Sequence, residues 1–450
     1  MRIGVTRLRW WVSGLLGIVL AAAQGVGWAA GLPNPLTLET ALELALADHP
    51  SAQRADSDRL LAQSERAAAE AQQGTRLDLS ARLRWVEPPS SSVFAERNDS
   101  AAILRLRQPL SDFGYTEARR DAADAAIEGS EWGYLDARQQ LQLQVMQAFF
   151  AVLLADLAYA RDNEAMAIAF LDLDKARERA ELGQVSDVRL FELDSLYQQA
   201  RRVRSQAVMA QRLSRIRLAA ALNRPDDLPA ALVSPAERDP VLPERPLADW
   251  RQEVLTNNPE LRRLRAELAA ARAAARAADK RHGPAVYAEL EAGTYERETG
   301  STYPLAAGVF LEWPLISGGE RAAGQAAARA RLQARQAELT AAELRLGELL
   351  AERWLEGEVL QARWAEVRAQ GDYRELDLDR RRALYEMEVQ ADLGDAMVQA
   401  SAVRYERARV QFDAYMTQAR LAALAGRLPT RQPERLLESR GAADSAQETD

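Results

Sequence analysis

Side chains that could do chemistry are few in this chain, and their types exclude most reactions. Cysteine is absent, which rules out thiol catalysis, cysteine-based metal sites and disulfides. The two histidines, His49 and His282, lie far apart in the sequence and each stands alone. A histidine-built metal site or a catalytic triad with a histidine base is therefore not expected. We expect no resident metal and no cofactor.

Carboxylates are the remaining candidates, because the chain has 66 Asp and Glu residues. At that abundance, carboxylate pairs at helical spacing are expected on any solvated helix face, so such pairs indicate no catalysis. Asp392 and Asp395, in "ADLGDAM", are three residues apart and therefore share one helical face. Asp at the start of a helix also caps it. The sequence therefore predicts that the protein is not an enzyme.

The net charge of the chain bears on which classes of partner it could bind. The formal net charge is −8, and charged residues of both signs are mixed along the chain. A protein that binds nucleic acid would show a basic patch or stripe. No nucleic-acid partner is expected.

The chain contains an internal repeat, and the long helices of its two copies must position most of these charges. "QPLSDFGYTEARRDAA" at 108–123 is matched by "WPLISGGERAAGQAAA" at 313–328, and "LDLDKARERAELGQVSD" at 171–187 by "LDLDRRRALYEMEVQAD" at 376–392. In each copy two short helices precede two strands, and a very long helix (115–182, then 320–388), a turn and a last helix follow them. The sequence predicts the following divisions: signal peptide 1–29, first repeat 30–223, Pro-rich linker 224–246, second repeat 247–426 and disordered tail 427–450.

The start of the chain predicts secretion. Arginines precede the apolar run "WWVSGLLGIVLAAA", and Gly27 and Ala29 fit the small-x-small cleavage rule, so we expect cleavage after Ala29. An uncleaved membrane anchor is the alternative, but the apolar core is short for a spanning helix.

Four segments alternate apolar and charged residues with a period of two, which is typical of amphipathic strands. The segments are 76–86, 101–108, 285–293 and 304–313. Each has about the length that a tilted strand needs to cross a bilayer. Their charged faces carry Arg82, Arg84, Arg105, Arg107, Glu289, Glu291 and Glu312, whereas Trp85 and Trp313 end their apolar faces. We expect a basic charged face in the first repeat and an acidic one in the second.

Strands that cross a membrane require an oligomer here. Four strands leave two open edges, and unpaired backbone groups cannot face lipid. Two copies would give eight strands and three copies twelve. The alternative, a soluble pair of hairpins with one face on a helical core, is disfavoured by the clustered charge and by the tryptophans, which suit the aromatic girdles at a membrane interface.

The order, duplication and spacing of these elements resemble the TolC-like family of outer-membrane efflux and secretion channels, over about residues 36–426. The resemblance rests on the duplicated unit, the opening "LTLETALELALADHP" and the paired "QPLSDFG" and "WPLISGG" junctions. It implies a mainly α fold with a small β part. Three chains would form a twelve-stranded barrel in the outer membrane of a Gram-negative bacterium, continued by a periplasmic α-barrel. Its implied partners are two further copies, a periplasmic adaptor, an inner-membrane pump or ABC transporter, and outer-membrane lipid.

The resemblance also implies roles for the turns at the helix ends. The tip that contacts the adaptor would include Gly183 and Ser186 in the first repeat, and Glu388 and Ala391 in the second, where the family pattern is lost. Acidic residues at the place of Asp392 and Asp395 line the periplasmic constriction in the family. Asp187 aligns with Asp392 and is a further candidate for that gate.

Two other functions remain to be weighed. A periplasmic coiled-coil adaptor or scaffold would explain the long helices but not the four strands with charged faces. An enzyme has no support among the residues. The sequence does not identify the cargo, which a partner pump would select.

Overall fold

The computed structural model describes residues 31–88, 96–235, 245–297, 302–387 and 392–428. The predicted signal peptide (1–29) lies outside these residues, as do Glu388, Ala391, part of the predicted linker and nearly all of the predicted tail.

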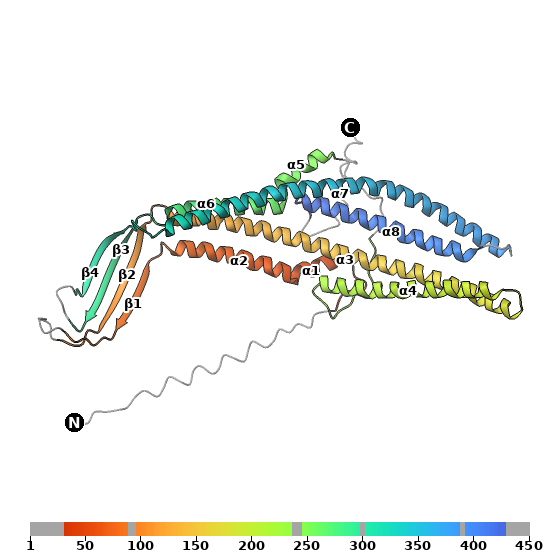
Figure 1. The fold of residues 1–450 in the computed structure, drawn as a ribbon, viewed down its shortest axis with the longest axis horizontal. Helices are drawn as coiled ribbons and strands as arrows, with labels where there is room; N and C mark the ends of the chain where they lie inside the picture. The colour runs from red at the N-terminus through yellow and green to blue at the C-terminus, as the bar shows by residue number, and fades with distance from the viewer. Residues whose placement is uncertain (1–30, 89–95, 236–244, 298–301, 388–391, 429–450) are drawn as a thin grey trace, which may run out of the picture.

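The same order of elements occurs twice along the chain (Figure 1). The first set is α1 (Leu38–Asp48), α2 (Pro50–Ala71), β1 (Arg76–Arg82), β2 (Ala101–Ser111), α3 (Tyr115–Glu181) and α4 (Asp187–Ala221). The second set is α5 (Leu247–Asn257), α6 (Pro259–Lys280), β3 (Ala285–Tyr295), β4 (Leu305–Glu312), α7 (Glu320–Glu386) and α8 (Leu393–Leu424).

The first strand is shorter than the alternation 76–86 suggests. β1 ends at Arg82, and a single bridge between Trp85 and Asn98 resumes the pairing. Between them, the backbone N–H of Arg84 donates to the side-chain oxygen of Ser100 at 3.3 Å, where a regular ladder would use a carbonyl. β2, in contrast, continues beyond the expected residue 108 to Ser111.

Glycine sets the sharp turn from strand to long helix in both repeats. Gly114 precedes α3 with φ +87°, and Gly319 precedes α7 with φ +92°. This left-handed conformation costs an L-residue with a side chain about 1–2 kcal/mol. At Gly114 a Cβ would also lie 2.5 Å from the Lys280 ammonium nitrogen. The "QPLSDFG" and "WPLISGG" segments therefore contain the turns that join the sheet to the long helices.

The sheet and the helices form one continuous layer (Figure 1). All neighbouring strands are antiparallel, in the order β1-β2-β3-β4. Beside the sheet the helical contacts follow the same sequence, α2-α3-α6-α7, and in the distal half they run α4-α3-α8-α7. The sheet is at one end of the elongated molecule, and the α3–α4 and α7–α8 turns are at the other (Figure 1).

The core lies midway along the helices, where α1 and α5 dock. One apolar cluster joins α1 to α3, α4 and α8, and a second joins α5 to α6, α7 and the end of α8. Fully buried members include Val145, Phe149, Leu218, Leu350 and Leu421.

Among the described helices, α3 alone has a stretch long and apolar enough to cross a membrane by composition. Val145, Phe149 and Val152 in that helix are fully buried against the first cluster. Part of the apolar stretch of α3 thus belongs to the protein core.

Candidate channel wall and helical tips

The strand register puts the charged residues on one face of the sheet and the apolar residues on the other. Leu79 pairs with Leu104, and Leu106 pairs with Leu290. The apolar face is bare: exposed members, with Leu79 at 74 % exposure and Val309 at 69 %, lie on all four strands. Because a soluble protein would cover such a face, the alternative of a sheet packed on a helical core is not what the structure shows.

The charged face is more neutral than the sequence suggested, because the basic and acidic strands are neighbours. Arg105 on β2 forms ion pairs with Glu289 (3.2 Å) and Glu291 (2.8 Å) on β3. Arg107 lies 3.6 Å from Glu312 on β4. Within one chain the expected basic and acidic sectors therefore neutralise each other where the two repeats meet.

At the far end of β1 the sequence reasoning missed a partner. The Asp99 carboxylate forms ion pairs with both Arg82 (3.5 Å) and Arg84. Its backbone N–H donates to the Arg84 carbonyl at 2.8 Å. Asp99 stood in a segment read only as a polar turn, so no signal in the sequence marked it.

The two tryptophans lie at opposite ends of the sheet. Trp85 follows β1 near the loop end, and Trp313 follows β4 next to the helices. Both are more than half exposed, at 72 % and 56 %. This separation along the strands is what two interfacial anchors require.

The α3–α4 turn is held by glycine and a serine cap. Gly183 has φ +72°, and no atom lies within 4 Å of where its Cβ would be. The Ser186 hydroxyl oxygen accepts a hydrogen bond from the Arg189 backbone N–H at 3.4 Å. Asp187 is the first residue of α4.

The α7–α8 turn brings the predicted carboxylates next to an arginine. Asp392 caps α8 by accepting from the Asp395 backbone N–H at 3.0 Å, and both side chains are exposed. The Arg381 guanidinium donates to the Asp392 carbonyl oxygen at 2.9 Å and lies 3.9 Å from the Asp395 carboxylate. It also pairs with the buried Asp377 at 3.0 Å. Sequence reasoning missed Arg381, although its spacing of four from Asp377 was a signal.

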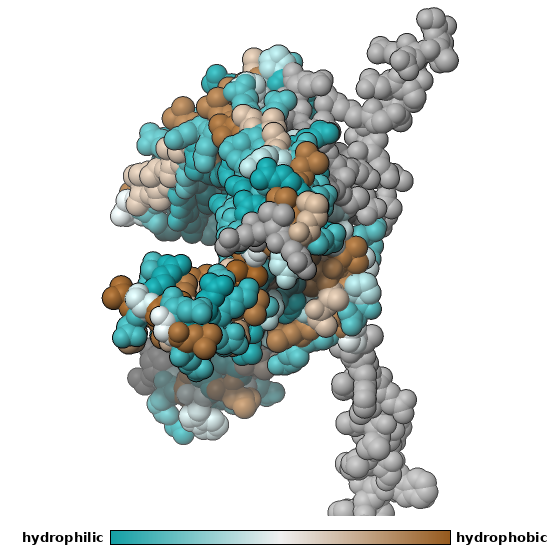
Figure 2. Space-filling view, turned by 90° about the vertical axis from the view of Figure 1, so that its right-hand side faces the viewer, coloured by the Kyte–Doolittle hydropathy of each residue, from teal (hydrophilic) through white to brown (hydrophobic). Residues whose placement is uncertain are grey.

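The helices at the two edges of the helical layer have large apolar side chains that are exposed. α4 exposes Val188, Phe191, Leu196, Met209, Leu213 and Ile216. α7 exposes Leu344, Leu355, Val359, Tyr373, Leu376 and Tyr385. Figure 2 views the molecule from the tips, with the α3–α4 hairpin below the α7–α8 hairpin. Apolar side chains lie among polar ones on the α3–α4 hairpin. In the distal half these two helices are the opposite edges of the layer.

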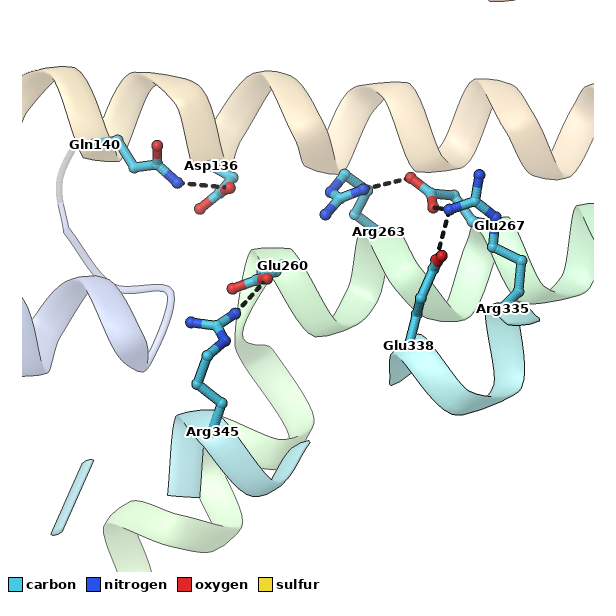
Figure 3. A network of polar contacts seen from close by, with 8 residues as sticks. All are labelled: Asp136, Gln140, Glu260, Arg263, Glu267, Arg335, Glu338 and Arg345. Carbon is cyan, nitrogen blue, oxygen red and sulfur yellow. Dashed lines mark hydrogen bonds and ion pairs between the residues drawn. The ribbon is translucent and has the colours of Figure 1, made fainter. Parts of the chain in front are cut away.

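A hollow of about 1310 Å³ opens between α2, α3, α6 and α7. Small residues such as Gly129, Gly133 and Ala274 line it, so the helices leave space between them. Charged side chains from α3, α6 and α7 meet along one side of this hollow (Figure 3). There Glu267 pairs with Arg263 (2.5 Å) and Arg335 (3.2 Å).

Asp136 in the same network forms no ion pair with the residues that the structure describes. It accepts a hydrogen bond from the Gln140 amide at 3.0 Å (Figure 3). Burial raises its pKa, and nearby Glu260 adds to the rise, whereas Gln140, Arg263 and Arg345 oppose it.

Comparison with known proteins agrees with this architecture. Residues 250–427 match the family described as outer membrane efflux protein. The curated Protein CyaE of Bordetella pertussis is 28 % identical over 337 residues, which cover 72 % of this chain and 70 % of that protein. The outer membrane protein VceC of Vibrio cholerae (18 % identity, TM-score 0.68) covers 88 % of this chain and 97 % of its own. The Campylobacter jejuni CmeC outer membrane channel (13 %, TM-score 0.72) covers 91 % and 88 %.

The second repeat thus matches the outer membrane efflux protein family, and the whole chain has the fold of outer-membrane channels such as VceC and CmeC. The fold predicted from the sequence, mostly helical with a small antiparallel sheet, is confirmed. So are its class of function, an efflux or secretion duct, and its location in the outer membrane with an extension into the periplasm. The family and fold are those of transport channels, and the adaptor alternative is not favoured.

Proposed function

We propose that three copies of this TolC-like chain close into one tunnel that serves as the exit duct of a tripartite efflux pump or type I secretion system. The observation that carries the assembly is the layer itself. Its sheet and its helices end at matching open edges, β1 and β4 in the sheet, and α4 and α7 in the distal half. β1 and β4 run in opposite directions, so β4 of one copy can pair antiparallel with β1 of the next.

Apolar side chains on the helical edges support the same closure. α7 and α4 are antiparallel, and their exposed residues lie at comparable distances from the tips. Tyr385 would meet Phe191 of the next copy near the tip, and Val359 would meet Leu213 farther along. Burying these side chains contributes about 1.5–3 kcal/mol each at full burial, which would favour association.

The absence of cysteine in the chain permits a direct test of closure. Val359→Cys combined with Leu213→Cys should give covalent dimers and trimers, and nothing larger, after oxidation of outer membranes. Placing a cysteine at Val359 and at Ala148, on the interior helix α3, is the control and should give monomers. A ladder that stops at dimers would overturn the trimer, and a ladder that continues would overturn closure.

In this assembly the charged face of the sheet lines the bore and the apolar face meets lipid. Leu79→Arg should therefore block membrane assembly, at about 2–4 kcal/mol if the residue lies near the midplane. Arg82→Leu should leave assembly nearly unchanged and alter conductance. Heat-resistant trimers on gels and single-channel conductance measure the two effects, and equal losses of assembly would reverse the assignment of faces.

The tips of the helices are the part that we propose to meet the partners. Gly183 and Ser186 would contact a periplasmic adaptor, and an inner-membrane pump or ABC transporter would supply the energy. Glu388 and Ala391 belong to the same proposal, although they lie outside the described residues. Site-specific crosslinking from Ser186 in intact cells should capture a periplasmic partner, and the same crosslinker at Arg251 on α5 is the control.

Asp392 and Asp395 are proposed as the gate of the closed tunnel, with Asp187 in a lesser role. Three copies would bring six exposed carboxylates together, and rings of acidic side chains favour cations. Replacing Asp392 with Asn and Asp395 with Ala should weaken block by hexamminecobalt added from the periplasmic side, while trimers stay intact. Asn is chosen because it retains the cap of α8. Unchanged block would leave Asp392 with the capping role alone.

A further inference from the structure

Two stacked aromatic side chains lie on the charged face of the sheet, which is the face opposite the apolar one that would meet lipid. Tyr287 on β3 and Phe310 on β4 are cross-strand partners. Their rings stack with centroids 5.3 Å apart and planes 17° apart. The Arg107 guanidinium, on β2, lies over the Tyr287 ring, with its central carbon 3.5 Å from the ring centroid. Arg107, Tyr287 and Phe310 thus form one stack across three strands.

The sheet makes room for this stack. A Cβ at Gly308 would lie 3.1 Å from the Phe310 ring, closer than ordinary contacts allow, so the glycine lets the ring lie along the strand. Phe310 nevertheless keeps 45 % of its surface exposed. A large apolar ring left half exposed on a face of arginines and glutamates is a costly arrangement for packing alone.

The charges around the stack favour one sign of ligand. Glu289 is opposite Gly308 in the register, and Glu312 lies two residues beyond Phe310 on the same face. Arg105 is shared between Glu289 and Glu291, and Arg107 pairs with Glu312. On β2, β3 and β4 three carboxylates therefore face two guanidiniums, and on β1 Asp78 and Arg76, opposite Arg105 and Arg107, add one charge of each sign. One negative charge is left beside an exposed aromatic ring. This combination suits a cation with a flat aromatic body.

We propose that the stack of Arg107, Tyr287 and Phe310 is a binding step for planar aromatic cations as they cross the barrel. The inference rests on the proposed function, since the charged face lines a bore only when the copies close. Phe310 is two residues from the helix end of β4, so three copies would place three such steps in a ring where the helical tunnel enters the barrel.

The test uses the whole trimer and the dye proflavine, a flat tricyclic cation. Fluorescence anisotropy on detergent-purified trimers measures binding, and single-channel recording measures how long each dye molecule blocks the pore. Phe310→Leu, which keeps an apolar side chain and removes the ring, should weaken dye binding and shorten the block about tenfold. Phe310→Trp should restore both. Choline, a cation without a ring, should block no longer in the parent protein than in Phe310→Leu.

Tyr295 provides a matched control on the same face. Its ring lies against Gly293 as that of Phe310 lies against Gly308, but its hydroxyl donates to Glu291 at 3.0 Å, and it stacks on no other ring among the described residues. Tyr295→Leu should leave the proflavine block within twofold of the parent. Equal losses in the two Leu variants, or an equal block by naphthalene-2-sulfonate, would overturn the proposal. If the parent trimer forms no pore at all, the proposed function itself fails, which the recordings distinguish from a pore without dye preference.

Discussion

At the end of α3 and α4 the chain turns on Gly183 and restarts at Ser186, whereas at the end of α7 and α8 it restarts at Asp392 beside Arg381. The first tip has a neutral cap, and its cross-helix ion pair, Arg177 with Asp194 at 3.6 Å, joins α3 to α4 away from the turn itself. In the second tip one guanidinium bridges α7, the turn and the first residues of α8. Both tips therefore have an ion pair between their helices, but only in the second does an arginine also contact the residue that caps the returning helix.

That difference has a functional meaning within the proposed duct. A turn whose own residues are held by backbone conformation and a neutral cap depends less on charge, although the Arg177–Asp194 pair lies farther along its helices. A turn held by an arginine between carboxylates responds to cations, salt and partner charges, because each of these competes for the same groups. The second repeat is thus suited to be the element that moves, and the first to be the fixed contact.

The largest effect should follow Arg381→Ala. This change leaves the buried Asp377 carboxylate without its ion pair and should destabilise the α7–α8 tip by about 2 kcal/mol. Hydrogen exchange of the amides in the last turn of α7 and the first turn of α8 measures that loss. Arg382→Ala is the control, because its contact with Asp379 is exposed and 4.0 Å long, and it should cost under about 0.5 kcal/mol. Equal exchange in both variants would remove the distinction between the tips.

A smaller effect, confined to the first tip, should follow Gly183→Ala. The left-handed φ of +72° makes a Cβ costly there, by about 1–2 kcal/mol, even though nothing crowds the position. Gly324→Ala, within α7 and likewise uncrowded, should instead stabilise its helix by about 0.5–1 kcal/mol. Amide exchange near each site, compared between the variants, gives the sign. A destabilisation of the same size at Gly324 would show that the cost is not conformational.

The caps should differ less. Ser186→Ala and Asp392→Ala each remove one hydrogen bond to a helix start, at about 1 kcal/mol. Asp392→Ala should cost slightly more, because a carboxylate also interacts favourably with the helix dipole. Raising the salt concentration should shrink the excess for Asp392 and leave Ser186 unchanged. Exchange rates at the first amides of α8 and α4, at low and high salt, measure the two costs. An excess for Asp392→Ala that does not change with salt would contradict the role of the helix dipole.

The smallest effect concerns Asp136, which contrasts with Asp377 because it has a hydrogen bond from Gln140 where Asp377 has an arginine. Its pKa is raised in the folded protein, so the folded state binds the proton more tightly than the unfolded chain. Stability from this group therefore rises as the pH falls through the folded pKa and levels off below the unfolded pKa. Asp136→Asn should be more stable than the parent at neutral pH, and the difference should vanish on acidification. Thermal melts of both proteins between pH 7 and pH 4 measure it, and a difference that grows in acid would refute the assignment.

Much of this fold was readable from the sequence because its periods are long and regular. The strict alternation in "RLDLSARLRWV" marked a strand, and "QPLSDFG" and "WPLISGG" marked two equivalent junctions. The long helix in each repeat was expected to within a few residues, since no proline interrupts it. Patterns of this kind depend only on neighbours along the chain.

What could not be read depends on which segments become neighbours in space. The pairing of Arg105 with Glu291 needs β2 next to β3, and strands 186 residues apart carry no local sign of that pairing. Asp99 was missed for the same reason, because it acts across a turn. Arg381 did have a local sign in its spacing from Asp377, but its contact with Asp392 is made across the turn. The stack of Tyr287 and Phe310 likewise depends on the register of β3 and β4, which alternation alone does not fix.

The join between β2 and β3 also dictates when the sheet can form. Synthesis delivers the first hairpin long before the second, and a lone two-stranded hairpin is at best marginally stable in water. Until β3 arrives, β2 has an unpaired edge and Arg105 has no carboxylate partner from the second repeat. Because contacts so distant in sequence form slowly, the half-made chain passes through a stage in which its bare apolar strands are prone to aggregate. We therefore expect the first repeat, expressed alone, to require a holdase in the periplasm, and the full chain to lose that need once its second hairpin has docked.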